Sequence, residues 1–180
     1  MTVADFLNKV KELREITGVG FKDCKQAIDE CSGDIEKSID FLRKKGISKA
    51  GKKMQRVAAD GLIAIQESDN KICIVEINCE TDFVAKNKEF IKFSEEILKI
   101  SFQNKSDLLL VENAKIFENK TTKDYLIDLI SKIGEKITIR RSNFFDNQNL
   151  KNYYYIHNPI KDNMGKIGVV VSIETKKTSI

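Results

Sequence analysis

The segment that most constrains the fold runs from a buried strand through a polar corner into a helix. Residues 72–77 form an apolar run, which is typical of a buried strand. Residues 78–87 (NCETDFVAKN) break this pattern, and Asn87 is expected to be the N-cap of an amphipathic helix that runs to about residue 101. A strand-to-helix corner can present side chains rigidly to a partner. This corner carries an acid beside an aromatic, Asp82 and Phe83.

The residues alone allow two interpretations of this pair, and they favour the first. Phe is usually buried, so Phe83 could cap the core while Asp82 caps a helical turn. Alternatively, both side chains could face a partner at an exposed corner.

Composition narrows the class of protein. The chain has 180 residues, of which 41% are hydrophobic and 32% charged, which suits a globular fold rather than a disordered one. Its net charge of +4 is too mild to argue for nucleic acid by itself. No apolar run approaches a membrane span, and the N-terminus lacks the basic flank and apolar centre of a signal peptide. We therefore expect a cytoplasmic protein that does not bind membranes.

The four cysteines are Cys24, Cys31, Cys73 and Cys79. No pair has Cys-x-x-Cys spacing and the only histidine, His157, is remote in sequence, so a zinc site is disfavoured. We expect free thiols in a reducing compartment, with no metal and no cofactor. Cys79 beside the corner leaves a thiol enzyme as one alternative, although no base stands near it in the sequence. The only Gly-x-x-x-x-Gly-Lys match, at residues 46–52, is followed by Lys53 where a P-loop has Ser or Thr, so the chain itself is not predicted to be a P-loop GTPase.

The hydrophobic periodicity predicts an α+β protein that begins with a three-helix bundle over residues 1–47. Thr2 and Asp34 are the expected N-caps of the first and third helices, and Gly33 suits a left-handed C-cap. Gly46 is expected to end the third helix. The helices cover about residues 2–16, 22–31 and 35–45.

Seven basic residues and no acid follow between residues 43 and 56. This strip could contact RNA or the ribosome, which makes a binding adaptor the second candidate function. It could equally be a solvated helix end leading into a linker over residues 48–60. We favour the second interpretation because no aromatic residues are interleaved for base stacking.

The remainder is predicted to be a core of antiparallel strands with packed helices, divided into residues 61–133 and 134–180. A β-hairpin is expected from residues 62–65 and 71–78, with its turn at 68–70. A helix is expected from Thr122 to the stop at Gly134, and no element is predicted for 103–121. Further strands are expected at 137–145, 153–157 and 166–173.

Three stretches of the sequence resemble the elongation factor Ts family. The corner, with EINCE at 76–80 followed by TDFVAKN at 81–87, is nearly identical to that family's signature. The bundle is similar in its TGVG at 17–20, DCKQA at 23–27 and GDIEK at 33–37. More weakly, 134–141 and 165–171 look like the family's second half. The resemblance implies a ubiquitin-associated-like bundle and a nucleotide exchange factor for elongation factor Tu that is not an enzyme and does not bind nucleotide itself.

The resemblance also implies roles for individual residues. The corner would enter the GTPase domain of the partner and help dislodge Mg²⁺, through Thr81, Asp82, Phe83 and Val84. The bundle would dock on the same domain around Val19, Gly20 and Cys24. His157 would face another domain of elongation factor Tu; a surface histidine in a hairpin is the alternative, and nucleic acid is not an expected partner.

The sequence departs from the family's pattern at two places. Residues 159–164 form an insertion where the family has a shorter turn. In longer members further helices follow the strand at 165–171, so residues 134–180 are expected to form only the start of the second subdomain.

Overall fold

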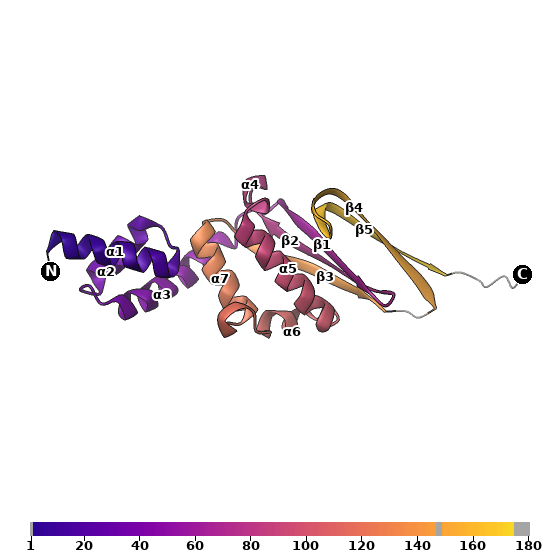
Figure 1. Ribbon diagram of the computed structural model, residues 1–180, viewed down its shortest axis with the longest axis horizontal. Helices are drawn as coiled ribbons and strands as arrows, with labels where there is room; N and C mark the ends of the chain where they lie inside the picture. Colours follow the sequence, from indigo (N-terminus) through magenta and orange to yellow (C-terminus); the bar gives the residue numbers. More distant parts are fainter. Residues whose placement is uncertain (1, 147–148, 175–180) are drawn as a thin grey trace, which may run out of the picture. The chain divides into compact units, whose positions relative to one another are not determined.

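The computed structural model describes residues 2–146 and 149–174. Its architecture confirms the predicted α+β class, since N-terminal helices precede an antiparallel sheet (Figure 1). The chain divides into two compact units. One comprises Met1–Arg56 with Ile127–Glu135, and the other comprises Val57–Leu126 with Lys136–Ile180.

The first unit is built on α1 (Val3–Thr17), α2 (Phe21–Glu30) and α3 (Ile35–Lys53). Both predicted N-caps are present, because Thr2 Oγ1 accepts a first-turn N–H of α1 at 3.1 Å and Asp34 Oδ1 accepts one of α3 at 3.0 Å. Gly33 is left-handed, with φ of 81°. The helices close on a small apolar core made of Val10, Leu13, Cys24, Ala27, Ile28 and Leu42.

The prediction that Gly46 ends the third helix is wrong, because α3 continues to Lys53. Helix α7 (Thr122–Ile133) contributes its last residues to this unit. A Cβ at position 46 would lie only 2.5 Å from Ser131 Oγ. The glycine therefore permits close packing inside a helix instead of ending one. The first part of the expected linker, up to residue 53, is consequently helical.

The second unit is organised around the predicted hairpin, now seen as β1 (Asp60–Ser68) and β2 (Lys71–Cys79). Asp69 and Asn70 form the two-residue turn with φ of 51° and 62°, as a type I′ turn requires. Strand β3 (Ile137–Phe145) pairs antiparallel with β2 over the predicted range. The sheet order among the described strands is β3-β2-β1-β5-β4, so one sheet joins strands from both halves of the core.

The second hairpin, β4 (Leu150–Lys161) and β5 (Met164–Glu174), is longer than predicted. Residues 159–164, which are predicted to be an insertion, extend the two strands, and Pro159 is accommodated where the register shifts. The hairpin joins the sheet through two residue pairs, Ile63 with Gly165 and Ala64 with Met164. At its other end, Asn70 Nδ2 donates to the Leu150 carbonyl at 2.6 Å and Asn70 Oδ1 accepts from the Asn152 N–H at 3.0 Å.

Helix α5 (Lys88–Gln103) packs against β1 and β2 and supplies much of the core of this unit. Phe90 and Phe93 are completely buried, and Tyr125 of α7 stacks on Phe93 with ring centroids 5.9 Å apart. The stretch for which no element was predicted contains α6 (Leu108–Asn113) and a 3₁₀ turn, η1 (Phe117–Asn119). Between β2 and α5 lies one short helical turn, α4 (Asp82–Ala85).

Candidate functional site

The strand–helix corner is held in shape by side-chain caps. Thr81 precedes α4 in an extended conformation, and its Oγ1 accepts from the Val84 N–H at 3.4 Å. Thr81, rather than Asp82, is therefore the cap of this turn. The predicted cap of α5 is confirmed, since Asn87 Oδ1 accepts from the Glu89 N–H at 2.8 Å. Two caps within a few residues define the direction of the chain on both sides of α4.

Hydrogen bonds also anchor the corner to the sheet. Cys79 Sγ donates to the Thr81 carbonyl at 3.1 Å, and Glu80 Oε1 accepts from the backbone N–H of Lys136 at 2.6 Å. Asn78 Nδ2 donates to the Asp60 carbonyl at 3.0 Å. The corner is thus tied to β1 and to the start of β3, which gives it a rigid base.

Phe83 projects from this base into solvent. Its exposed fraction is 82%, whereas the neighbouring Val84 is 8% exposed and Ala85 is 1% exposed. The turn therefore buries its small apolar side chains and displays its largest one. Exposure of this degree excludes Phe83 as a cap of the core, which was the first of the two interpretations.

The charges around the corner alternate in sign. Lys86 Nζ lies 2.8 Å from Asp82 Oδ2, and this hydrogen bond raises the pKa of the Lys86 ammonium. A second pair joins Asp60 to Lys166 of β5, and the hydrogen bond from Lys166 lowers the pKa of the Asp60 carboxyl. The Asp82–Lys86 pair is largely exposed, so it holds Asp82 only weakly and leaves its carboxylate accessible.

The structure places the predicted bundle residues in different environments. Gly20 is exposed at the start of α2, Val19 is half-buried against the bundle core, and Cys24 is completely buried. Cys24 Sγ donates to the Val19 carbonyl at 3.4 Å, and burial raises the pKa of its thiol. Cys24 can therefore support a docking surface through the core but cannot touch a partner directly.

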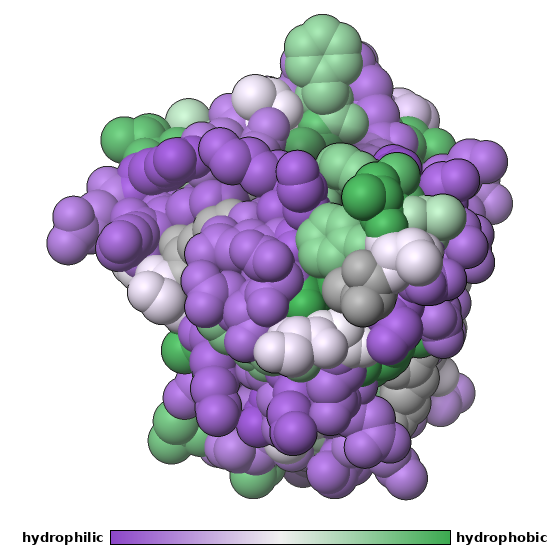
Figure 2. All heavy atoms as spheres, turned by 90° about the vertical axis from the view of Figure 1, so that its left-hand side faces the viewer, coloured by the Kyte–Doolittle hydropathy of each residue, from purple (hydrophilic) through white to green (hydrophobic). Residues whose placement is uncertain are grey.

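Sequence reasoning missed an exposed aromatic next to these residues, Phe21, which is 45% exposed at the first position of α2. Its helical spacing from Cys24 would have predicted burial, so the sequence carried no signal for its exposure. Figure 2 looks onto the side of the molecule that carries α1–α3 and shows hydrophobic atoms gathered in a small patch on a mainly hydrophilic surface. The exposed apolar side chains of the bundle are Val3, Leu7, Ile16, Phe21 and Ile47.

His157 lies on β4, separated in the sheet from β2 and its corner by β5 and β1. Its side chain is exposed, and the Tyr155 hydroxyl lies 3.2 Å from its Nδ1. The structure therefore does not bring His157 together with the corner residues in one pocket.

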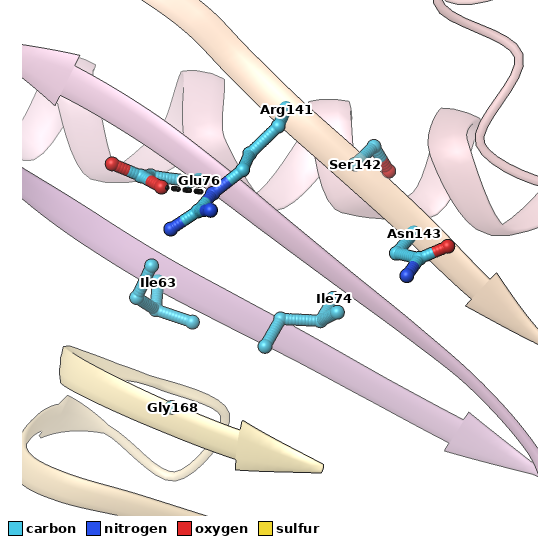
Figure 3. Close-up of a pocket in the computed structure, with 7 residues that line it drawn as sticks. All are labelled: Ile63, Ile74, Glu76, Arg141, Ser142, Asn143 and Gly168. Carbon is cyan, nitrogen blue, oxygen red and sulfur yellow. Dashed lines mark hydrogen bonds and ion pairs between the residues drawn. The ribbon is translucent and has the colours of Figure 1, made fainter.

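A separate hollow of about 270 Å³ lies on the sheet, over β1, β2 and β3 and beside β5 (Figure 3). Its most buried charged group is Glu76, which accepts from Arg141 Nε at 2.6 Å and lies 3.4 Å from Arg140 Nη1. Ile63 and Ile74 form an apolar floor, and the side chains are seen in Figure 3. Because the carboxylate is engaged by two guanidinium groups, the hollow presents no free acid or base.

The described part of the chain contains no group of three or more His, Cys, Asp or Glu side chains that could hold a metal ion. All four cysteines are free, as predicted. Within the described residues, no helix is both long and apolar enough to cross a membrane.

The fold and the corner together define an α+β protein with a helical bundle and a sheet core that displays an aromatic side chain on a rigid strand–helix turn. A family model described as elongation factor TS matches residues 80–179, which include the whole of α4. The chain belongs to the elongation factor Ts family.

Curated relatives agree with this assignment. An elongation factor Ts of Methylobacterium nodulans is 43% identical over 167 residues, covering 92% of this chain and 54% of its own length. Those of Brucella anthropi and Gluconobacter oxydans are 44% and 39% identical, covering 92% and 94% of this chain and 54% and 56% of their own lengths. The chain thus spans about half the length of the curated relatives it matches.

Proposed function

We propose that this chain acts in translation elongation, in the cytoplasm, as a guanine nucleotide exchange factor for elongation factor Tu. It binds the GDP form of its partner, promotes release of GDP by displacing Mg²⁺ and distorting the nucleotide site, and so allows GTP to rebind. Membership of the elongation factor Ts family supports this proposal. The observation that carries it is the exposure of Phe83, whose side chain is 82% exposed on a corner that hydrogen bonds tie to the sheet.

Exchange of this kind requires little chemistry from the exchange factor. A GTPase holds its nucleotide through many simultaneous contacts to phosphate and Mg²⁺. A factor that binds best to the distorted, nucleotide-free site weakens nucleotide binding, and rebinding nucleotide weakens the factor by the same free energy. Two features are sufficient. One is a rigid apolar side chain that inserts into the partner, which we call the wedge, and the other is a polar side chain that competes for a group near the metal, which we call the polar competitor. No catalytic residue and no cofactor are therefore needed in this chain.

The corner residues divide this task. Phe83 is the wedge that enters the GTPase domain of the partner. Asp82 is the polar competitor near the metal, and its weak pairing with Lys86 leaves it free to exchange partners. Thr81 holds the turn through its capping hydroxyl, and buried Val84 fixes α4 to the sheet.

Two further contacts belong to the proposal. The bundle docks on the same GTPase domain, with Val19 and Gly20 at the surface and Cys24 supporting them from the core. His157 faces another domain of elongation factor Tu from the exposed side of β4. The chain itself binds neither nucleotide nor nucleic acid.

The test is stopped-flow release of a fluorescent GDP analogue from elongation factor Tu. Replacing Phe83 by Ala should lower the stimulated release rate at least ~10-fold, since a wedge contact in the distorted state is worth about 1.4 kcal/mol or more. Val57→Ala is the matched control, because Val57 is equally exposed and lies outside the corner. A Phe83→Ala protein that stimulates release as fast as the unmodified chain would refute the wedge.

A further inference from the structure

One buried carboxylate beside the hollow on the sheet draws two guanidinium groups together. Glu76 of β2 is only 9% exposed, and it accepts from Arg141 Nε at 2.6 Å. Arg140 Nη1 donates to the other oxygen of the same carboxylate at 3.4 Å. We call Glu76, Arg140 and Arg141 the arginine cluster.

A β-bulge makes this convergence possible. Glu76 is opposite Arg141 in the register and Ile77 is opposite Ile139, so Arg140 is an extra residue without a partner on β2. In a regular strand the side chains of neighbouring residues point to opposite faces of the sheet. A bulge re-aims a side chain, and this one allows both arginines to reach the same carboxylate.

The arginine cluster has more donors and more positive charge than Glu76 can use. A guanidinium group has five N–H donors, and the bonds to Glu76 engage one N–H of each arginine. Among the described residues, no other acidic side chain pairs with Arg140 or Arg141. Their side chains are 60% and 76% exposed, so the remaining N–H groups are accessible. Two guanidinium groups and one carboxylate leave one positive charge, which matches a ligand with a single negative charge.

The hollow next to the cluster supplies an apolar surface. Ile63 and Ile74 lie in it, and Figure 3 shows Arg141 reaching from β3 toward Glu76 on the same side of the sheet. Gly168 of β5 closes it on the other side. Its volume of about 270 Å³ is just below the usual range of about 300–1,000 Å³ for small-ligand sites. The hollow therefore fits a small acid and not a nucleotide.

We propose that the hollow and the arginine cluster bind a monovalent carboxylate with a small apolar body, either a free acid or the C-terminal residue of a polypeptide. The ligand carboxylate accepts from the unused N–H groups of the two arginines, and the apolar body covers Ile63 and Ile74. Glu76 holds the guanidinium groups in place beforehand, so less side-chain entropy is lost on binding. This site is separate from the corner and does not depend on the exchange function.

Titration of the ¹⁵N-labelled full chain with N-acetyl-leucine, followed by amide chemical shifts, tests this proposal. We expect shifts at the residues that line the hollow and a Kd on the order of 1 mM. N-acetyl-leucinamide has the same apolar body without the charge and should bind at least ~10-fold more weakly. Inorganic phosphate should also bind at least ~10-fold more weakly, because it has no apolar body. Equal affinity for phosphate would overturn the proposal, since the site would then recognise charge alone.

A tetrapeptide that ends in leucine distinguishes the two sources of the ligand. Binding at least ~10-fold tighter than that of N-acetyl-leucine supports a polypeptide C-terminus, because the preceding residues then add contacts. Equal binding supports the free acid.

Substitutions of the two arginines complete the test. Arg140→Gln and Arg141→Gln should each weaken binding of N-acetyl-leucine at least ~10-fold, since each removes a charged donor. Arg43→Gln is the matched control, because Arg43 is an exposed arginine on α3. Circular dichroism and the thermal midpoint establish that each variant is folded before it is compared.

Two results would overturn the proposal. One is unchanged amide shifts of the unmodified chain at N-acetyl-leucine concentrations up to about 20 mM, well above the expected Kd. The other is an affinity that neither glutamine variant lowers. The arginine cluster would then serve only to keep β3, an edge strand, from pairing with other chains.

Discussion

Phe83 and Phe93 are the same residue type in consecutive helices of one unit, yet one is 82% exposed and the other is completely buried. Helix α5 has several turns and a broad apolar face, so it can bury its aromatics against the sheet. Helix α4 is a single turn that uses Val84 and Ala85 for burial, which leaves Phe83 on the outside. Both residues are equally hydrophobic, so hydrophobicity does not decide which phenylalanine is buried. The difference comes from the length of each helix and from its orientation, which the N-caps determine.

The largest effect should come from the buried member of the pair. Phe93→Ala removes a completely buried ring that stacks on Tyr125 and should lower the free energy of unfolding by about 3–5 kcal/mol. Urea denaturation followed by circular dichroism measures this change. Phe93→Leu is the control and should cost less. A loss below about 1 kcal/mol for the alanine variant would contradict the assignment of Phe93 to the core.

The next effect concerns the cap that orients the corner. Thr81→Ala removes the acceptor for the Val84 N–H and should destabilise the protein by about 0.5–2 kcal/mol. Because the turn also aims Phe83, stimulated GDP release should fall, while Thr81→Ser should preserve both properties. If the serine variant is as impaired as the alanine variant, the threonine methyl group and not the capping hydroxyl holds the corner.

A smaller effect should depend on pH. The pKa of Asp60 is lowered in the folded protein by its hydrogen bond with Lys166, so the pair stabilises the fold above the unfolded pKa of about 3.9. That stability is lost as the pH falls through the lower, folded pKa. Asp60→Asn should therefore lower the free energy of unfolding by less than about 1 kcal/mol at neutral pH. It should have no effect at a pH at which the Asp60 carboxyl of the unmodified protein is protonated. The urea midpoints of the unmodified protein and of the Asp60→Asn variant are compared at neutral and at strongly acidic pH. If the variant still has the lower midpoint in acid, the cause is steric and not the charge of Asp60.

The smallest change in stability should come from the exposed member of the pair. Phe83→Ala removes a ring that contributes little to the core, so the free energy of unfolding should change by less than about 0.5 kcal/mol. Differential scanning calorimetry beside the Phe93→Ala variant makes the contrast quantitative. Comparable destabilisation by the two substitutions would abolish the distinction between corner and core.

Local chemistry made much of this fold predictable. Thr2, Asp34 and Asn87 were recognised as N-caps because each has a short acceptor side chain before an apolar periodic run. The turn at 68–70 is predictable because Ser68, Asp69 and Asn70 form a cluster of turn-forming residues between two apolar runs. Strand β3 was predicted with its observed ends.

The parts that sequence reasoning missed depend on distant partners. Gly46 looks like a helix stop until Ser131, far along the chain, is packed against it. The strands predicted at 153–157 and 166–173 are longer in the structure, because the register shift between β4 and β5 accommodates Pro159. The exposure of Phe83 follows from where α4 points, which no periodicity encodes in a helix of one turn; only the resemblance of the corner to a known family suggested it.

The side chain of Asn70 has a further consequence, for the order in which the sheet assembles. Its hydrogen bond to Leu150 closes a loop of 80 residues, whereas each of the two hairpins is closed by neighbouring residues. Contacts between residues so far apart in sequence form slowly, because the chain must first lose the entropy of the intervening loop. We expect β1–β2 and β4–β5 to form as separate local structures and to join late, so that each hairpin is complete before the sheet is.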